Sequence, residues 1–264
     1  MEKLQIVKIG GNVIDNEDLL DQFLTDFANI NEPKILIHGG GKLATRVAKK
    51  LNVPQKMIDG RRVTNKATLD IITMVYGGLI NKKIVAKLQA INCDAIGLTG
   101  VDANCVKAEK RKNVEVDFGF VGDIKAGGVN EHRISQLIEM GITPVFSAIT
   151  HDGKGNLLNT NADTMASKIA ISMVDQYDSQ LTFCFEKKGV LLDVNDENSL
   201  LETINPVEYN KLIDSKKISE GMIPKLDSAF DALINGVETV KICHAEELNS
   251  TGTALMKDSV FFIK

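Results

Sequence analysis

The chain has 264 residues, of which 44% are hydrophobic and 25% charged, as is ordinary for a soluble globular protein. Its formal net charge of −4 argues against a general nucleic-acid-binding protein, which would be basic. No apolar run is long enough to span a membrane, no signal-peptide pattern precedes the first strand, and the four cysteines show no metal-ligand spacing. We therefore expect a cytoplasmic protein with reduced thiols and no metal site of its own.

The first two predicted strands both end on glycines. Residues 4–9 form an apolar run that contains Lys8 and stops at Gly10 and Gly11, and a helix is predicted over residues 15–30. Residues 35–37 form a second buried run, which stops at residues 38–41 (HGGG) before a helical pattern over 43–51. Glycines at the start of a helix leave backbone N–H groups open to a ligand, and the helix dipole favours an anion there. The pattern predicts an anion site; a tight turn without a ligand is the alternative.

Helices and strands alternate along the rest of the chain. This alternation predicts an open, mostly parallel sheet with helices on both faces, and ligands bind at the carboxyl ends of the strands in such folds. Further helices are predicted over residues 65–92, 130–140, 164–174, 206–216 and 226–235, and strands over 94–98, 143–150, 180–185, 239–243 and 259–263. In the first of these helices, Gly77-Gly78 would loosen the helix, bring another backbone close or break it in two. Hairpins are predicted over 56–64, with a turn at Asp59-Gly60, and over 105–129, and a loop over 218–225.

Polar residues gather where these strands end. Lys8 precedes the first glycine pair, Asp163 follows two asparagines at a helix start, and residues 186–189 (EKKG) follow the strand over 180–185. Each has an ordinary explanation, since a lysine can leave an edge strand for solvent and an aspartate can cap a helix. The topology nevertheless predicts that they converge on one edge of the sheet, together with the glycines.

Seven short motifs carry a resemblance that covers essentially the whole chain. They are residues 8–11 (KIGG), 38–41 (HGGG), 60–64 (GRRVT), 81–82 (NK), 119–123 (GFVGD), 159–163 (NTNAD) and 221–225 (GMIPK). In this order and spacing they resemble the amino acid kinase family, and within it the members that phosphorylate an N-acylated glutamate in arginine biosynthesis. The resemblance implies a three-layer α/β/α sandwich with one continuous, mainly parallel sheet. It also implies an N-terminal lobe (1–178) for the acylated amino acid and for dimerisation, and a C-terminal lobe (179–264) for ATP.

The resemblance further implies the roles of single residues. Lys8 and Lys225 would stabilise charge on the phosphoryl group in transfer, and Asp163 would orient both lysines. Binding residues are implied for the substrate (Gly40, Gly41, Arg62 and Asn159) and for the nucleotide (Gly10, Gly11, Glu186, Lys187, Gly189, Lys217 and Ser219). ATP would bring its own Mg²⁺, and the expected partners are the N-acyl-L-glutamate and a second copy of the chain, with no nucleic acid or membrane.

The chemistry of such a reaction agrees with the residues themselves. A carboxylate is already a nucleophile at pH 7, so no general base is needed. Because two anions must be brought together, the site needs cations and backbone amide dipoles, and these are the groups at the predicted strand ends.

Some features depart from the family or leave alternatives open. Glu186-Lys187 stands where the family usually has a Ser/Thr-Asp pair, which affects the nucleotide side. The first strand starts near Met1, without the extra N-terminal helix of arginine-inhibited hexamers, so we expect an arginine-insensitive homodimer.

The acyl group could be acetyl or succinyl, with Lys82, Arg61 and Lys66 as candidate contacts for a succinyl carboxylate. Kinases of carbamate, aspartate or UMP, or a non-catalytic nucleotide-binding regulator, are the alternative functions.

Overall fold

The computed structural model describes residues 1–58, 61–112, 115–193, 195–215, 217–218, 222–248 and 250–257. The strands are β1 Lys3–Ile9, β2 Lys34–His38, β3 Lys56–Ile58, β4 Arg61–Val63, β5 Ala95–Thr99, β6 Glu109–Lys110, β7 Gly122–Asp123, β8 Thr143–Ser147, β9 Ile149–His151, β10 Leu157–Asn159, β11 Asp178–Phe185, β12 Thr203–Ile204, β13 Thr239–His244 and β14 Thr253–Leu255. The α-helices are α1 Gly11–Asp15, α2 Glu17–Ala28, α3 Gly41–Lys50, α4 Lys66–Ile72, α5 Asn81–Ala90, α6 Glu131–Glu139, α7 Ala162–Ser172, α8 Pro206–Asp214 and α9 Ile223–Ile234. A π-helix, η1 Thr73–Ile80, joins α4 to α5, and short 3₁₀ turns cover Asp102–Asn104, Glu197–Ser199 and Ala245–Glu247.

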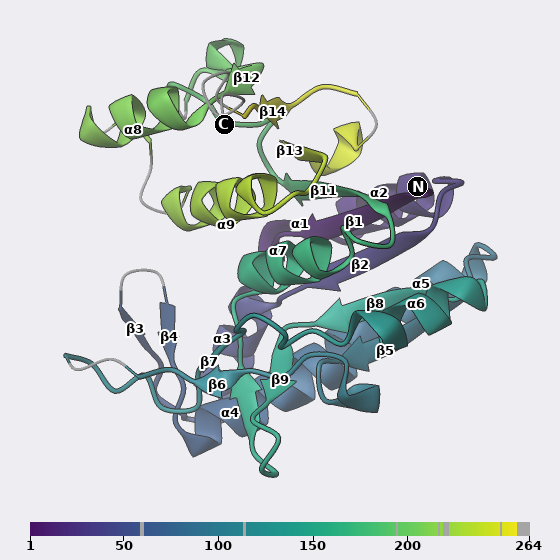
Figure 1. Ribbon diagram of the computed structural model, residues 1–264. Coiled ribbons are helices and arrows are strands. Elements are labelled where there is room, and N and C mark those ends of the chain that lie inside the picture. The colour runs from purple at the N-terminus through teal and green to yellow at the C-terminus, as the bar shows by residue number, and fades with distance from the viewer. Residues whose placement is uncertain are drawn as a thin grey trace.

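The central sheet has eight strands in the order β12-β14-β13-β11-β1-β2-β8-β5 (Figure 1). All neighbours from β13 to β5 are parallel; β14 runs antiparallel to β13, and β12 is parallel to β14. This confirms the predicted open, mainly parallel sheet. The sheet is continuous across residue 178, so the two predicted lobes share it, while their separate roles stay a prediction.

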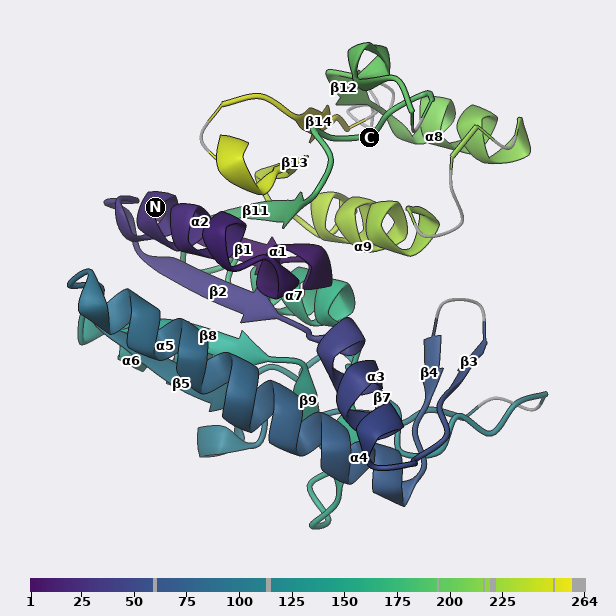
Figure 2. The same ribbon diagram turned by 180° about the vertical axis from the view of Figure 1, so that it is seen from behind.

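Helices cover both faces of the sheet, and the alternation of side chains along β1 separates the two faces. Leu4 and Ile6 pack into a core with α7 and α9, whereas Val7 and Ile9 pack into a second core with α2, α3 and α5. The two groups of helices lie in front of the sheet in Figures 1 and 2 respectively. Because side chains alternate along a strand, Lys8 shares the face of Leu4 and Ile6. It therefore points toward α7, at the carboxyl end of β1.

Some elements differ from the predictions in their bounds or continuity. Of the outcomes predicted for Gly77-Gly78, a break into two helices does not occur, because the chain stays helical there and passes through the wider π-helix η1. The helix predicted over 15–30 is α2, Glu17–Ala28, which starts later because the side chain of Asn16 accepts from Leu19 N and caps it, and the short helix α1 precedes it. The predicted loop over 218–225 and the helix start at 226 were wrong in part: α9 begins at Ile223, with Pro224 in its first turn, where a proline is tolerated. The predicted strand over 259–263 and the turn at Asp59-Gly60 lie outside the described residues.

Two predictions from composition can be compared with the fold. The four cysteines are buried free thiols. Within the described ranges, no helix is both long enough and apolar enough to cross a membrane.

Candidate active site

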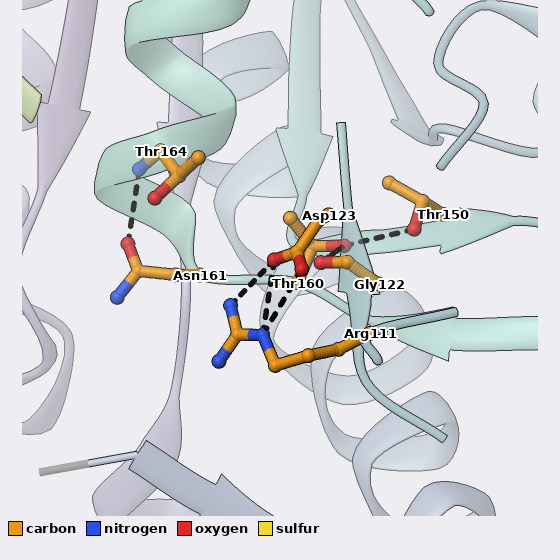
Figure 3. Close-up of polar contacts among 7 residues, drawn as sticks. All are labelled: Arg111, Gly122, Asp123, Thr150, Thr160, Asn161 and Thr164. Atoms are coloured by element: carbon orange, nitrogen blue, oxygen red, sulfur yellow. Dashed lines mark hydrogen bonds and ion pairs between the residues drawn. The ribbon is translucent and has the colours of Figure 1, made fainter. Parts of the chain in front are cut away.

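A buried ion pair marks the carboxyl end of β1. Lys8 Nζ lies 2.7 Å from Asp163 Oδ1, and both residues are less than 10% exposed. Asp163 is in the first turn of α7, but it is not the cap of this helix. The side chain of Asn161 accepts from Thr164 N at 2.9 Å and takes that role (Figure 3). The Asp163 carboxylate therefore does not cap the helix and pairs with Lys8 instead. Of the two explanations that the sequence allowed for Asp163, a helix cap or a site residue, the structure favours the second.

Lys225 approaches the same pair from α9. Its Nζ lies 5.4 Å from the centre of the Phe185 ring, at the carboxyl end of β11. Burial lowers the pKa of Lys225 from its ordinary value, the Asp163 carboxylate raises it, and the nearby Lys8 lowers it further. Lys225 is thus within electrostatic range of Lys8 and Asp163, which places two cations near one carboxylate.

The glycines after β1 lead directly into α1. The N–H of Gly10 donates to Cys184 O at 2.9 Å, so this N–H is used by the sheet and is not open to a ligand. A side chain on Gly10 would press on Phe185, with its Cβ only 3.2 Å from that of Phe185, whereas the space beside Gly11 is open to 4 Å. Gly11 is the first residue of α1, and its N–H has no acceptor within the helix. Of the two predicted donors, Gly11 is thus the one that the geometry favours.

The glycines after β2 form a second open helix start. Gly40 has φ +148°, a conformation that essentially only glycine adopts, and a Cβ there would collide with Ile80 and crowd Tyr76. Gly41 is the first residue of α3, so its N–H likewise precedes the first intrahelical hydrogen bond. This close contact between η1 and the loop is what requires glycine at position 40.

Arg62 and Asn159 lie beside this second helix start. Nη2 of Arg62 donates to Gly41 O at 2.9 Å and to Thr45 Oγ1 at 2.8 Å, and Nη1 donates to the side chain of Gln55. Nδ2 of Asn159, at the end of β10, donates to Thr64 Oγ1 at 3.0 Å. Both side chains are thus fixed by neighbours on other elements.

One cavity of about 400 Å³ lies between the start of α3, Arg62, Asn159 and Asp163. Its wall includes Gly39, Gly40, Gly41, Arg61, Arg62, Tyr76, Arg111, Asn159, Asn161, Asp163 and Asp227. The structure therefore brings together the predicted substrate residues and Asp163, as the topology predicted. Tyr76 and Arg111 were missed by the sequence reasoning, because neither belongs to a motif and each reaches the cavity only through tertiary packing.

The predicted nucleotide residues are more scattered. Nδ2 of Asn12, in α1, donates to Glu186 Oε1, which joins the turn after β11 to the start of α1. Gly189 packs tightly against Thr253, so its role in the structure is close packing of the segment after β11 against β14. Lys217 follows α8, where its N–H donates to Leu212 O at 3.0 Å, and Lys187 follows Glu186 in the turn after β11. Ser219 lies outside the described residues.

The donor groups of this region suit a polyphosphate better than a bare metal ion. The described part of the chain has no group of three or more His, Cys, Asp or Glu side chains that could hold a metal ion. It has instead two lysines, Lys8 and Lys225, and two open helix starts, and such groups bind phosphate and carboxylate oxygens.

Residues 3–244 match the sequence model of the Amino acid kinase family. The chain belongs to the amino acid kinase family. Its amino acid kinase relatives include two proteins named acetylglutamate kinase. The one from Cytophaga hutchinsonii is 53% identical over 94% of each chain; the one from Phocaeicola vulgatus is 48% identical over 97% of this chain and 99% of its own. Among solved structures, smu.665 from Streptococcus mutans UA159 has a TM-score of 0.80 at 26% identity and covers 96% of this chain and 98% of that one. The family that the seven motifs predicted is thereby confirmed.

Proposed function

We propose that this protein transfers the γ-phosphoryl group of ATP to the γ-carboxylate of an N-acyl-L-glutamate and so forms an acyl phosphate, as a step of arginine biosynthesis. The observation that carries the proposal is the Lys8–Asp163 pair with Lys225 near it, because Asp163 lies in the wall of a cavity that the open start of α3 also lines. The name acetylglutamate kinase, borne by relatives that are 46–53% identical, supports the same reaction.

The mechanism follows from charge. The substrate carboxylate is the nucleophile and needs no base, so the protein has to hold two anions together and neutralise the charge that develops between them. Lys8 and Lys225 supply the positive charge, and Asp163 fixes the position of Lys8 through their ion pair. The N–H groups of Gly11 and Gly41 supply further donors. Mg²⁺, carried by the nucleotide, would neutralise charge on the phosphate oxygens.

The substrate would lie in the 400 Å³ cavity. Arg62 would bind its α-carboxylate, because a guanidinium can hold a carboxylate by two hydrogen bonds. Asn159 would bind the amide region, and Gly40 and Gly41 the reacting γ-carboxylate. The nucleotide would lie on the other side of the two lysines, toward Gly11 and the segment that follows β11, including Glu186, Lys187, Gly189, Lys217 and Ser219.

Arg111 favours an acyl group that ends in a carboxylate, such as N-succinyl. Its Nε and Nη2 meet the Asp123 carboxylate at 3.1 and 2.5 Å along one edge of the guanidinium, and the remaining Nη1 points away from Asp123 (Figure 3). Arg111 lines the substrate cavity, where an acetyl methyl group would offer it no partner. Of the three candidates from the sequence, only Arg61 is also in the cavity wall. Lys66 pairs with Asp70 on the surface, and Lys82 donates to Gly97 O at 2.8 Å.

The test is ADP release with Mg-ATP and four acceptors, namely N-acetyl-L-glutamate, N-succinyl-L-glutamate, aspartate and UMP, with hydroxylamine to trap an acyl phosphate as a hydroxamate. We expect turnover and hydroxamate with an N-acylglutamate, and the ratio of the two acyl substrates identifies the preferred one. Turnover with aspartate or UMP alone would contradict the proposal in favour of another kinase of this family. Nucleotide binding without turnover on any acceptor would favour a non-catalytic regulator.

We further propose that the enzyme works in the cytoplasm as a homodimer, without nucleic acid or membrane partners. Sedimentation velocity at micromolar concentration tests the oligomeric state, and a monomer or hexamer would contradict it.

A further inference from the structure

His38 is the last residue of β2 and directly precedes the glycines of the proposed site. Its side chain is completely buried. Nδ1 of its ring lies 2.8 Å from the carbonyl oxygen of Gly39, and Nε2 lies 3.0 Å from Nδ2 of Asn81, the first residue of α5. The ring is therefore held between the glycine loop and the helix that follows η1. It does not line the cavity, so it has no direct part in the proposed reaction.

The partners of Asn81 decide which ring nitrogen of His38 carries the proton. Oδ1 of Asn81 accepts from Lys82 Nζ at 3.2 Å, and Nδ2 donates to Val145 O at 2.9 Å. A lysine ammonium only donates and a carbonyl only accepts, so the amide can have only one orientation. It follows that Nδ2 of Asn81 also donates to Nε2 of His38, and that Nδ1–H of His38 donates to Gly39 O. Burial lowers the pKa of His38 to about 4, so the ring is neutral near pH 7.

This hydrogen bond has a consequence on the opposite side of the peptide. A trans peptide group is planar, with its C=O and N–H pointing in opposite directions, and the described chain contains no cis peptide bonds. When the Gly39 carbonyl points at the His38 ring, the N–H of Gly40 must point away from it. Gly40 itself lies in the cavity wall, with a φ of +148° that sterics alone would not enforce. The ring thus fixes the direction of an N–H at the site.

We propose that His38, in the tautomer set by Asn81, is a positioning residue that holds the Gly40 N–H toward the substrate's reacting carboxylate. This inference rests on the proposed function for the identity of the anion. Removing one fixed N–H donor from a developing negative charge lowers kcat by roughly a hundred- to a thousand-fold in well-studied cases. A misdirected N–H at Gly40 should therefore affect turnover more than the affinity for ATP.

A matched pair of variants separates the two ring nitrogens. In His38→Asn the amide nitrogen takes nearly the place of Nδ1 and can still donate to Gly39 O. In His38→Gln it takes nearly the place of Nε2 and cannot. We expect kcat of His38→Gln to lie roughly ten- to a hundred-fold below that of His38→Asn, with similar KM for ATP and similar melting temperatures. Equal kcat values in the two variants, at any level, would overturn the proposal.

The tautomer of the unaltered protein gives a second test that needs no folded variant. With ¹⁵N-labelled histidine, NMR at pH 7 should show one ring protonated at Nδ1, a tautomer that free histidine disfavours. The signal is assigned to His38 by its absence from a His38 variant. If no such variant folds, it is assigned by its coupling to labelled Asn81. A ring protonated at Nε2 in its place would contradict the inference. This measurement involves no substrate, so it stands even if the unaltered protein phosphorylates no N-acylglutamate, an outcome that would count against the proposed function alone.

Discussion

At the scale of single residues, the site is arranged to hold negative charges close together. Lys8 and Lys225 are both drawn out of solvent around Asp163, and a buried cation is costly unless an anion lies beside it. In the absence of nucleotide, Asp163 is that anion. When the nucleotide phosphates and the substrate carboxylate enter, the same lysines face these two groups as well as Asp163. Their positive charge then lies beside the phosphoryl group during its transfer.

Removal of either lysine tests this arrangement. We expect Lys8→Ala and Lys225→Ala each to lower kcat by roughly a hundred-fold or more, which corresponds to about 3 kcal/mol of lost transition-state stabilisation. Lys66→Ala is the matched control, because Lys66 forms only an exposed pair with Asp70. Steady-state ADP release measures all three. Near-normal turnover in either of the first two variants would refute the assigned role.

The lowered pKa of Lys225 predicts a specific pH dependence. As the pH rises through this pKa, Lys225 loses its proton and the site loses a cation, so kcat/KM for ATP should fall at a pH below the 10.5 of an ordinary lysine. This parameter reports the free enzyme. In Lys225→Arg the guanidinium stays charged, so the fall should move to higher pH whatever the absolute activity. An identical alkaline limb in both proteins would show that another group causes it.

Arg111 allows a test of acyl-group preference. We expect Arg111→Met to lower kcat/KM for N-succinyl-L-glutamate relative to N-acetyl-L-glutamate by roughly ten- to a hundred-fold, as the loss of a hydrogen bond to a charged group would do. Asp123→Asn is the control, since it weakens the Arg111–Asp123 pair and keeps the guanidinium. In Asp123→Asn the ratio of kcat/KM for N-succinyl-L-glutamate to that for N-acetyl-L-glutamate should stay close to that of the unaltered protein. If Arg111→Met left the ratio of kcat/KM for the two acyl substrates unchanged, Arg111 would not contact the acyl group.

The sequence predicts residues of this site unevenly. Lys8 and Asp163 could be found because each lies at the end of a predicted strand or the start of a predicted helix, positions that a parallel sheet brings together. Arg111 could not, since it lies in an irregular segment whose path depends on pairing with β7 and on contact with the ring of Phe118. Gly10 follows β1 as predicted, but the hydrogen bond that occupies its N–H, to Cys184 O, depends on strand pairing that no local pattern encodes.

At the scale of elements, the two helix starts differ in how strictly they need glycine. Gly40→Ala would combine a strained φ with a collision against Ile80, so we expect it to lower the free energy of unfolding by about 2–4 kcal/mol. Gly11→Ala meets no atom within 4 Å and should leave stability within about 0.5 kcal/mol. Its methyl group should nevertheless raise KM for ATP, because it enters the space proposed for phosphate.

Thermal melts and ATP titrations of both glycine variants provide the measurement. A stable Gly40→Ala protein would mean that Ile80 and η1 can move away from the loop. An unchanged KM for ATP in Gly11→Ala would place the phosphates elsewhere than at the start of α1.

The element scale also shows where sequence patterns stop being sufficient. The helical periodicity over 65–92 is clear, yet it cannot distinguish a break at Gly77-Gly78 from the π-helix that the structure contains. That choice is made by packing: Tyr76 and Ile80 of η1 contact the loop at Gly40, and Gly77 lies against Thr99. π-helical turns are frequent at functional sites. Here Tyr76, a residue of η1, lies in the wall of the cavity.

At the scale of the whole molecule, alternation of strands and helices predicts the layered architecture because each strand between two helices must be buried on both faces. The order of strands is another matter. β11 joins β1 at the centre of the sheet although more than 150 residues separate them, and β14 turns back antiparallel at the edge. Such long-range pairings follow from the fit of whole layers, so the sequence could predict the sheet but not its order.

The buried His38 should also make the stability of the whole molecule depend on pH. Its folded-state pKa of about 4 lies below the ordinary 6.5, so between these values the unfolded chain binds a proton that the folded protein does not. The contribution of the neutral His38 ring to the free energy of unfolding is fully present above pH 6.5, declines as the pH falls, and is lost below about pH 4. The difference between the two pKa values corresponds to roughly 3 kcal/mol. Urea unfolding of the unaltered protein and of His38→Asn from pH 7.5 to 4 should therefore give curves that converge on acidification, because the variant lacks this group. Curves that stay parallel would show that the His38 ring takes up its proton as readily in the folded protein as in the unfolded chain.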